Sequence, residues 1–299
     1  MVFGKFNDLC EKTSLPICQV LINGESDVIK TGILPTCYAR PIELANTVIF
    51  QVGNAFVNIG ALIILMIIIY NIRAKYTAIG RLEMLTYYHT LVGMIICSLV
   101  VDCGVTPPGS ASYSYFVALQ LAFASASCAS LVFCGLLGFR LWEDGTKVSL
   151  WILRAFAFVW GVVTFIVALF TFHDWDKNHV IDGDHTTGLF VICYVINAVF
   201  LGLYLITQVV LATMVLQNYW VLSTIALSLI SFVLGQIFVY VLSEPICQGV
   251  NHYIDGLFFG SLCNLFSIMM LYKFWDMTTD DDLEFSISIN RKGEVFYDK

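Results

Sequence analysis

Cysteines are the residues of this chain whose chemistry is easiest to anticipate. The chain has ten of them, and five lie outside its long apolar runs: Cys10, Cys18, Cys37, Cys103 and Cys247. In an oxidising compartment such thiols pair as disulfides, whereas elsewhere a cysteine is often a small apolar side chain. We expect at most two bridges among these five, and the sequence leaves both the pairing and the purely apolar role open.

A second group of reactive side chains lies between residues 173 and 185. It is rich in histidine and aspartate and consists of His173, Asp174, Asp176, His179, Asp182, Asp184 and His185. Its spacing matches no common metal site, so we expect a solvated loop without a metal ion. The chain also lacks a Walker phosphate loop, an HExxH motif and a GxSxG motif. We therefore expect no catalytic residues and no cofactor, which favours a protein that is not an enzyme.

Seven long apolar runs must position whatever groups are functional. The chain is 59% hydrophobic and 12% charged, while soluble domains are about one quarter charged. The runs cover 45–70, 84–101, 113–139, 150–172, 188–216, 219–242 and 256–272. Each is long enough to cross a bilayer, and lipid leaves the backbone only its own hydrogen bonds. We predict an all-α polytopic membrane protein, a bundle of seven transmembrane helices surrounded by lipid, with no nucleic-acid partner.

The basic residues predict the orientation of this bundle, because Lys and Arg gather at cytosolic ends of spans. The links after the first and third runs and the segment after the seventh contain Arg73, Lys75, Arg81, Arg140, Lys147, Lys273, Arg291, Lys292 and Lys299. The alternate links contain only Lys177. We expect a lumenal N-terminal segment (1–44), a transmembrane domain (45–275) and an acidic cytosolic tail (276–299), although the N-terminal segment also carries basic residues.

Ionisable side chains are scarce within these predicted spans. Between the bounds given above there is no Asp, Glu or Lys, and only His89 and Arg154 carry ionisable groups of another kind. All six prolines lie outside the spans. Coupled transporters generally need buried ionisable groups and often use broken helices. The pattern therefore disfavours a pump or a coupled transporter.

Small and amide side chains form the polar content of the spans. In the third run Ser114, Ala118, Ala122, Ala126 and Ser130 recur every four residues, so they form one row where a neighbouring helix can approach closely. Further polar positions are Asn54 and Asn58 in the first run and Asn264 and Ser267 in the last. These four side chains either bond neighbouring helices of the same bundle or face a helix of a partner, and both interpretations remain open.

The tail offers one short motif. Asp282-Leu283-Glu284 has the Asp-x-Glu form of acidic signals that vesicle coat proteins read on cargo leaving the endoplasmic reticulum. The alternative is a solvated, acidic chain end without a specific reader.

Long strings of residues resemble one family, the fungal chitin synthase export chaperones. They include GILPTCYAR at 32–40, VVDCGVTPPGSASYSYFVALQ at 100–120, GFRLWEDGT at 138–146, and the segments 44–81 and 252–285. The resemblance implies a multi-pass protein of the endoplasmic reticulum membrane that helps a chitin synthase fold and leave for the cell surface, in support of cell-wall chitin synthesis. The Gln-x-x-Arg-Trp motif of processive synthases is absent, which indicates the helper and not the synthase.

Three other functions remain as alternatives. The chain could be a stable regulatory subunit that travels with the synthase to the plasma membrane and acts there. It could be a seven-span receptor, but the third run ends in GFRLW without an Asp-Arg-Tyr equivalent and the last run lacks Asn-Pro-x-x-Tyr. It could also transport a small molecule, which the scarcity of ionisable groups in the predicted spans disfavours.

Overall fold

The computed structural model describes residues 4, 6–21, 32–44, 47–76, 78–139, 145–173, 186–216 and 219–294, and it describes their side chains as far as Thr279 except at 44, 47, 215 and 216. Seven helical segments in this part of the chain are long and apolar enough to cross a membrane. They are α2 (Val52–Ala74), α3 (Arg81–Asp102), α4 (Ala111–Leu137), α5 (Lys147–His173), the composite segment from α6 to η3, α8 (Tyr219–Tyr240) and α10 (Gly256–Glu294). The predicted all-α, seven-span fold is thus confirmed.

The fifth span is irregular along its length. It comprises the short helix α6 (Thr187–Phe190), the π-helical η2 (Val191–Ile196), α7 (Asn197–Val210) and the π-helical η3 (Leu211–Leu216). It is also the least enclosed of the seven spans. In its most apolar stretch 11% of the residues are buried, against 50% in the corresponding stretch of α4. The row of small residues in α4 accounts for the contrast, because it lets neighbouring helices pack closely against α4.

The first span begins later than the apolar run that predicted it. Residues 45–51 were expected to be helical, but β1 (Ile42–Leu44) and β2 (Thr47–Ile49) form an antiparallel hairpin in which Ile42 pairs with Ile49. The backbone N–H groups of Phe50 and Gln51 then donate to the Asp102 carbonyl oxygen at 3.1 and 3.4 Å. The predicted start at residue 45 was therefore wrong, because an apolar β-branched segment satisfies its backbone here by strand pairing.

The expectation that the spans contain no acidic residue was also wrong. Helix α3 includes Glu83 in its first turn and Asp102 as its last residue, and the two side chains are only 0% and 2% exposed. The apolar run at 84–101 stops one residue short of each. Helix α10 likewise continues through Asp276, which pairs with Lys75 and Lys273.

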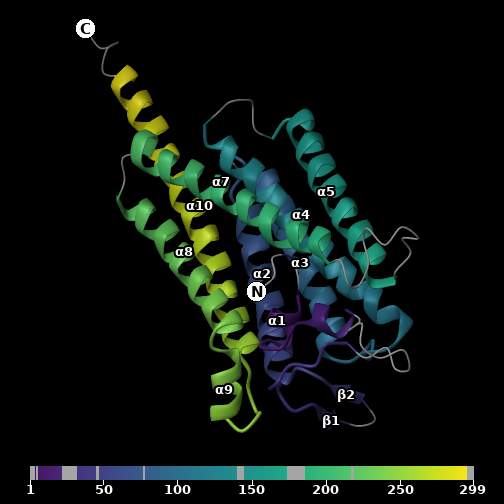
Figure 1. Ribbon diagram of the computed structural model, residues 1–299. Helices are drawn as coiled ribbons and strands as arrows, with labels where there is room; N and C mark the ends of the chain where they lie inside the picture. Colours follow the sequence, from purple (N-terminus) through teal and green to yellow (C-terminus); the bar gives the residue numbers. More distant parts are fainter. Residues whose placement is uncertain are drawn as a thin grey trace.

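Figure 1 shows the arrangement of these elements. Helices α8 and α10 lie side by side, and α5 lies at the opposite edge of the bundle. One end of the bundle, here called the cap end, carries α1 (Asn7–Cys10), the β1–β2 hairpin and α9 (Ser243–Gly249). At the other end, the tail end, α10 projects beyond its neighbours.

The buried apolar side chains form two cores. One fills the middle of the bundle and includes Leu65, Tyr88, Leu91 and Val221. The other joins the N-terminal cap, defined as the described residues 6–21 and 32–44, to the cap ends of α4, α5 and α6. Phe6 is 1% exposed in this second core, and its ring lies 5.6 Å from that of Phe190. The cap is therefore packed into the bundle as a part of its core.

Candidate functional site

The two asparagines of the first span meet an acid of the second. Asn54 and Asn58 of α2 donate their amide N–H groups to Asp102 Oδ2 of α3, at 2.7 and 2.9 Å. The Ser98 hydroxyl donates to the same oxygen at 3.2 Å, and Asn58 also lies 3.0 Å from the Ser98 hydroxyl oxygen. Neutral donors thus converge on a buried carboxylate, which compensates it for lost water. Helices α2 and α3 are joined by this cluster.

A second buried acid fastens the N-terminal cap. Ser14 of the cap donates its hydroxyl to Asp255 Oδ2 at 2.6 Å. Asp255 is the residue directly before α10. Gln51 donates its side-chain N–H to the Ser14 carbonyl oxygen at 2.7 Å. Burial raises the pKa of Asp255, while hydrogen bonds from Ser14 and from nearby backbone groups oppose the shift. The cap is therefore hydrogen-bonded to the residue before α10 and to the residue before α2.

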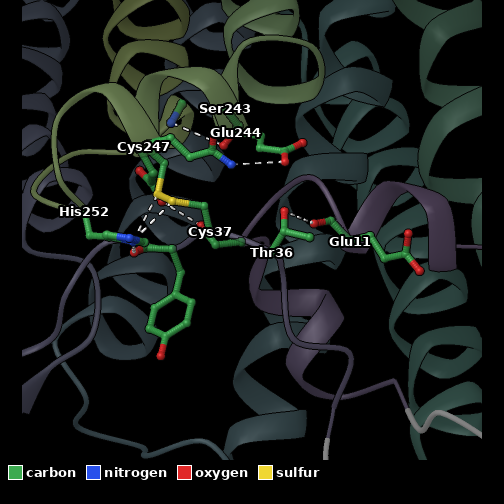
Figure 2. The surroundings of a disulfide bond; sticks show 12 residues. Glu11, Thr36, Cys37, Ser243, Glu244, Cys247 and His252 are labelled. Carbon is green, nitrogen blue, oxygen red and sulfur yellow. Dashed lines mark hydrogen bonds between the residues drawn. A yellow bond between two sulfur atoms is a disulfide. The ribbon is translucent and has the colours of Figure 1, made fainter.

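Four of the five cysteines outside the apolar runs pair at the cap end. Cys10 is bonded to Cys18 within the cap, across a sequence separation of 8. Cys37 is bonded to Cys247 of α9, across a separation of 210. Cys103 is free. The second bridge, drawn in Figure 2, joins the cap covalently to the segment between α8 and α10.

A histidine lies against the second bridge. His252 Nδ1 is 3.2 Å from Cys37 Sγ and 3.7 Å from Cys247 Sγ. Figure 2 shows the His252 side chain beside the bridge. The His252 backbone has φ +66°, which turns the chain after α9, and its carbonyl oxygen accepts from the Arg40 N–H at 2.8 Å. Cysteine and histidine are metal-ligand types, but a metal needs thiolates and both sulfurs are used in the disulfide. The disulfide and the hydrogen bond to His252 together attach the cap to α9 and the turn after it.

The two predicted polar positions of the last span face α8. The Ser228 hydroxyl lies 2.9 Å from that of Ser267 and donates to the Ser267 carbonyl oxygen at 3.0 Å. Gln236 donates to Asn264 Oδ1 at 3.5 Å. A Cβ added at Gly235 of α8 would lie only 3.1 Å from Asn264 Oδ1 and 3.1 Å from the Cβ of Cys263. This glycine allows the close approach of α8 to α10.

The row of small residues in α4 is also used within the chain. A Cβ added at Gly161 of α5 would lie 3.3 Å from the Ala122 carbonyl oxygen and 3.4 Å from the Ala126 Cβ. Ser125, next to this row, accepts a 3.0 Å hydrogen bond from Asn197 of the fifth span. Helix α4 therefore packs closely with α5 and is hydrogen-bonded to the fifth span.

Glu83 marks a corresponding polar contact near the tail end. Its Oε1 accepts from the Gly145 N–H at 3.0 Å and from the Ser149 hydroxyl at 3.1 Å, so α3 holds the beginning of α5. The sequence analysis missed Glu83, Asp102 and Asp255 as structural centres. All three stand directly beside an apolar run, and that position is the signal that could have indicated them.

Two predicted features lie partly outside the described residues. The backbone of α10 is helical to Glu294 and includes Asp282 and Glu284, but the description of side chains ends before them. Of the histidine- and aspartate-rich group, residues 174–185 are not described. His173 is described, and it lies 3.4 Å from the Ser114 hydroxyl through Nε2.

Comparison with known proteins gives a consistent result. The family description "Chitin synthase export chaperone" matches residues 2–289. A protein of that name from Debaryomyces hansenii is 55% identical over 96% of this chain and 93% of its own length. Proteins of the same name from Candida albicans and Saccharomyces cerevisiae are 54% and 49% identical over 96% and 100% of this chain, and over 93% and 99% of their own lengths. No solved structure matches. The chain belongs to the chitin synthase export chaperone family.

Proposed function

We propose that this chain is a membrane-embedded chaperone that promotes the folding of a chitin synthase and its exit from the endoplasmic reticulum, and so supports cell-wall chitin synthesis. The family match over residues 2–289, which include all seven spans, carries this proposal. In it the chain resides in the endoplasmic reticulum membrane and acts without catalysis. The cap end faces the lumen, where the oxidising environment preserves its two disulfides.

The physical basis of the proposed activity is binding to an assembled client. A synthase with many spans carries small or polar helix faces that stay unpaired until assembly. A helper that binds the assembled form stabilises it by mass action. At four positions the sequence left a role in client contact open: Asn54 and Asn58 bond Asp102, while Asn264 and Ser267 bond α8. We therefore place the client contact on another surface.

The outward face of the fifth span is that surface in our proposal. Val199, Ile206 and Met214 are 54%, 62% and 74% exposed there. Ala198 is exposed too, and a Cβ added at Gly202 would meet no atom within 4 Å. Small residues four positions apart let a second helix approach closely in a membrane. This span offers such a pair without any partner in the described part of the bundle.

A matched pair of substitutions tests the contact. Gly202→Leu should reduce recovery of the synthase with the tagged chaperone, because the added side chain holds a client helix away. Gly60→Leu is the control, since an added Cβ at Gly60 of α2 also meets no atom within 4 Å. Equal recovery with both variants would exclude the fifth span as the contact.

A deletion of the gene for this protein in its native host tests the function itself. A tagged chitin synthase is then followed by fractionation and microscopy. We expect the synthase to aggregate and to stay in the endoplasmic reticulum. Normal delivery with altered chitin output would instead show a regulatory subunit that acts at the cell surface.

The acidic tail supplies a second step in this proposal. We propose that vesicle coat proteins read Asp282 and Glu284 and that the chaperone leaves together with its client. Asp282→Ala combined with Glu284→Ala should then hold both proteins in the endoplasmic reticulum while their association persists. Normal export of the double variant would refute the signal and leave the folding activity untouched.

A further inference from the structure

Two arginines at the tail ends of α2 and α3 have no acidic partner among the described residues. Arg73 Nη2 donates to His89 Nε2 at 3.4 Å, and Arg81 Nη1 donates to the Arg73 carbonyl oxygen at 3.4 Å. The guanidinium carbon of Arg81 also lies 5.3 Å from the centre of the Tyr76 ring. A guanidinium has five N–H donors. Within the described part of the chain, most donors of both arginines are therefore left for another ligand.

Both ion pairs described at the tail end use the same acid, Asp276. Asp276 pairs with Lys75 and, at 2.8 Å, with Lys273. The His89 ring contacts both neighbours, with Nδ1 2.5 Å from the Leu85 carbonyl oxygen and Nε2 3.4 Å from Arg73 Nη2. Arg73 and His89 are both exposed on the bundle surface. The charges of Arg73 and Arg81, at the edge of the apolar surface, therefore have no acidic counterpart among the residues whose side chains the structure describes.

A shallow, open apolar groove lies on the outer face of α2, the helix that contains Arg73. It measures about 450 Å³ and is lined by Leu62, Ile63, Met66, Ile67 and Tyr70. Positions 66, 70 and 73 follow one another at helical spacing, so Arg73 continues the face that the groove occupies. From Leu62 to Arg73 the helix rises roughly 16 Å, which is about half of a bilayer's hydrocarbon thickness. The groove and the arginines together therefore span about one leaflet.

We propose that this surface binds an anionic phospholipid, with its phosphate on Arg73 and Arg81 and one acyl chain along the groove on α2. Arginine suits this role because its planar donors match phosphate oxygens in pairs. An apolar groove that ends at a basic cluster is complementary to a lipid that joins a chain to a negative headgroup. The site is separate from the proposed client contact on the fifth span.

Native mass spectrometry of the purified full-length protein tests the proposal, with phosphatidylinositol and phosphatidylcholine as probes. We expect the protein to retain phosphatidylinositol preferentially. Arg73→Gln combined with Arg81→Gln should weaken that retention by roughly 10-fold to 30-fold. The range follows because each basic residue strengthens the binding of an anionic lipid about fivefold. Lys147→Gln combined with Arg154→Gln is the matched control, because it removes two exposed positive charges from α5. Equal loss in both double variants would overturn the site.

A reporter variant keeps both arginines and tests the acyl chain directly. Met66 is 60% exposed, so Met66→Trp should fold and place an indole in the groove. Its added fluorescence should be quenched more by brominated phosphatidylinositol than by brominated phosphatidylcholine. Val159→Trp on the 59%-exposed position of α5 should show no such preference. The same quenching by both lipids would contradict the proposal.

Two further outcomes identify other occupants. Full displacement of the lipid by glycerophosphoinositol would show that the site recognises a soluble phosphate and needs no acyl chain. If the protein retains no anionic lipid, but the arginine double variant loses the synthase, the site binds an acidic segment of the client. Either result would overturn the lipid proposal.

Discussion

The Asn58 amide of α2 lies 2.9 Å from the Asp102 carboxylate of α3, across a separation of 44 positions. This bond turns a polar helix face that lipid would disfavour into an internal connection between two spans. Because Asn54 and Ser98 donate to the same oxygen, one acid organises three donors. The stability of the α2–α3 pair should therefore depend more on the acid than on any single donor.

Asp102→Leu should lower the free energy of unfolding by about 1–3 kcal/mol, because it leaves buried donors unpaired. Asn54→Leu should cost about 0.6 kcal/mol, the average for a hydrogen bond between membrane helices. Thermal unfolding of the purified protein in detergent measures both. Asp102→Asn is the control, because it keeps an acceptor oxygen and should fall between the two. A larger loss for Asn54→Leu than for Asp102→Leu would contradict this ranking.

Loss of the Cys37–Cys247 bridge should destabilise the protein more than loss of Cys10–Cys18. A bridge restricts the unfolded chain more when it closes a longer loop, and removal of a native disulfide costs about 2–5 kcal/mol. The separations are 210 and 8 residues. Thermal unfolding of the paired Cys→Ser variants gives the comparison. Cys103→Ser, at a free thiol, should leave stability unchanged, and peptide mapping without reductant should find Cys103 unpaired.

The docking of the cap should depend on pH through Asp255. Burial raises the pKa of Asp255 above its ordinary value of about 4. The folded protein therefore binds this proton more tightly than the unfolded chain. The resulting stabilisation is fully present below about pH 4 and is lost as the pH rises through the raised pKa.

Asp255→Asn separates this effect from others, since its amide oxygen still accepts from Ser14. Above pH 4 the unfolding temperature of the natural chain should fall relative to that of the variant until Asp255 is fully ionised. Parallel pH profiles for the two proteins would show that Asp255 does not titrate in this range.

Gly235→Val should separate α8 from α10. An added Cβ at Gly235 would lie 3.2 Å from the Gly260 carbonyl oxygen as well as against Asn264 and Cys263. Overpacking of this kind costs about 1–3 kcal/mol. Gly202→Val, where the added Cβ meets no atom within 4 Å, should leave stability nearly unchanged. Similar unfolding temperatures for both variants would show that the α8–α10 contact adapts to the larger side chain.

The sequence predicted the number and type of the spans because continuous apolar length is sufficient to determine them in lipid. It misplaced their ends for two physical reasons. Val48 and Ile49 are apolar whether they extend a helix or pair in β2. Glu83 and Asp102 are acidic residues, so an apolar count stops before them, although hydrogen bonds from Ser149 and Asn54 support them inside the bundle.

The fate of individual polar residues could not be derived from spacing. Asn54 and Asn264 have the same pattern whether they face a partner or a neighbouring span, and only the packing of α3 and α8 decides between the two. The cysteine pairing was open for the same reason. Cys37 reaches Cys247 because the cap folds back over α9, a contact across 210 positions that no local pattern specifies.

Helix α10 joins the two ends of the molecule as one continuous helix. It begins directly after Asp255, at the fastened cap, and continues without interruption for 39 residues to Glu294. At 1.5 Å per residue its length is roughly 58 Å, so a tilt of about 5° at its base moves the far end by about 5 Å. Any change at the disulfide-bonded end that tilted α10 would therefore displace the acidic end of the helix most.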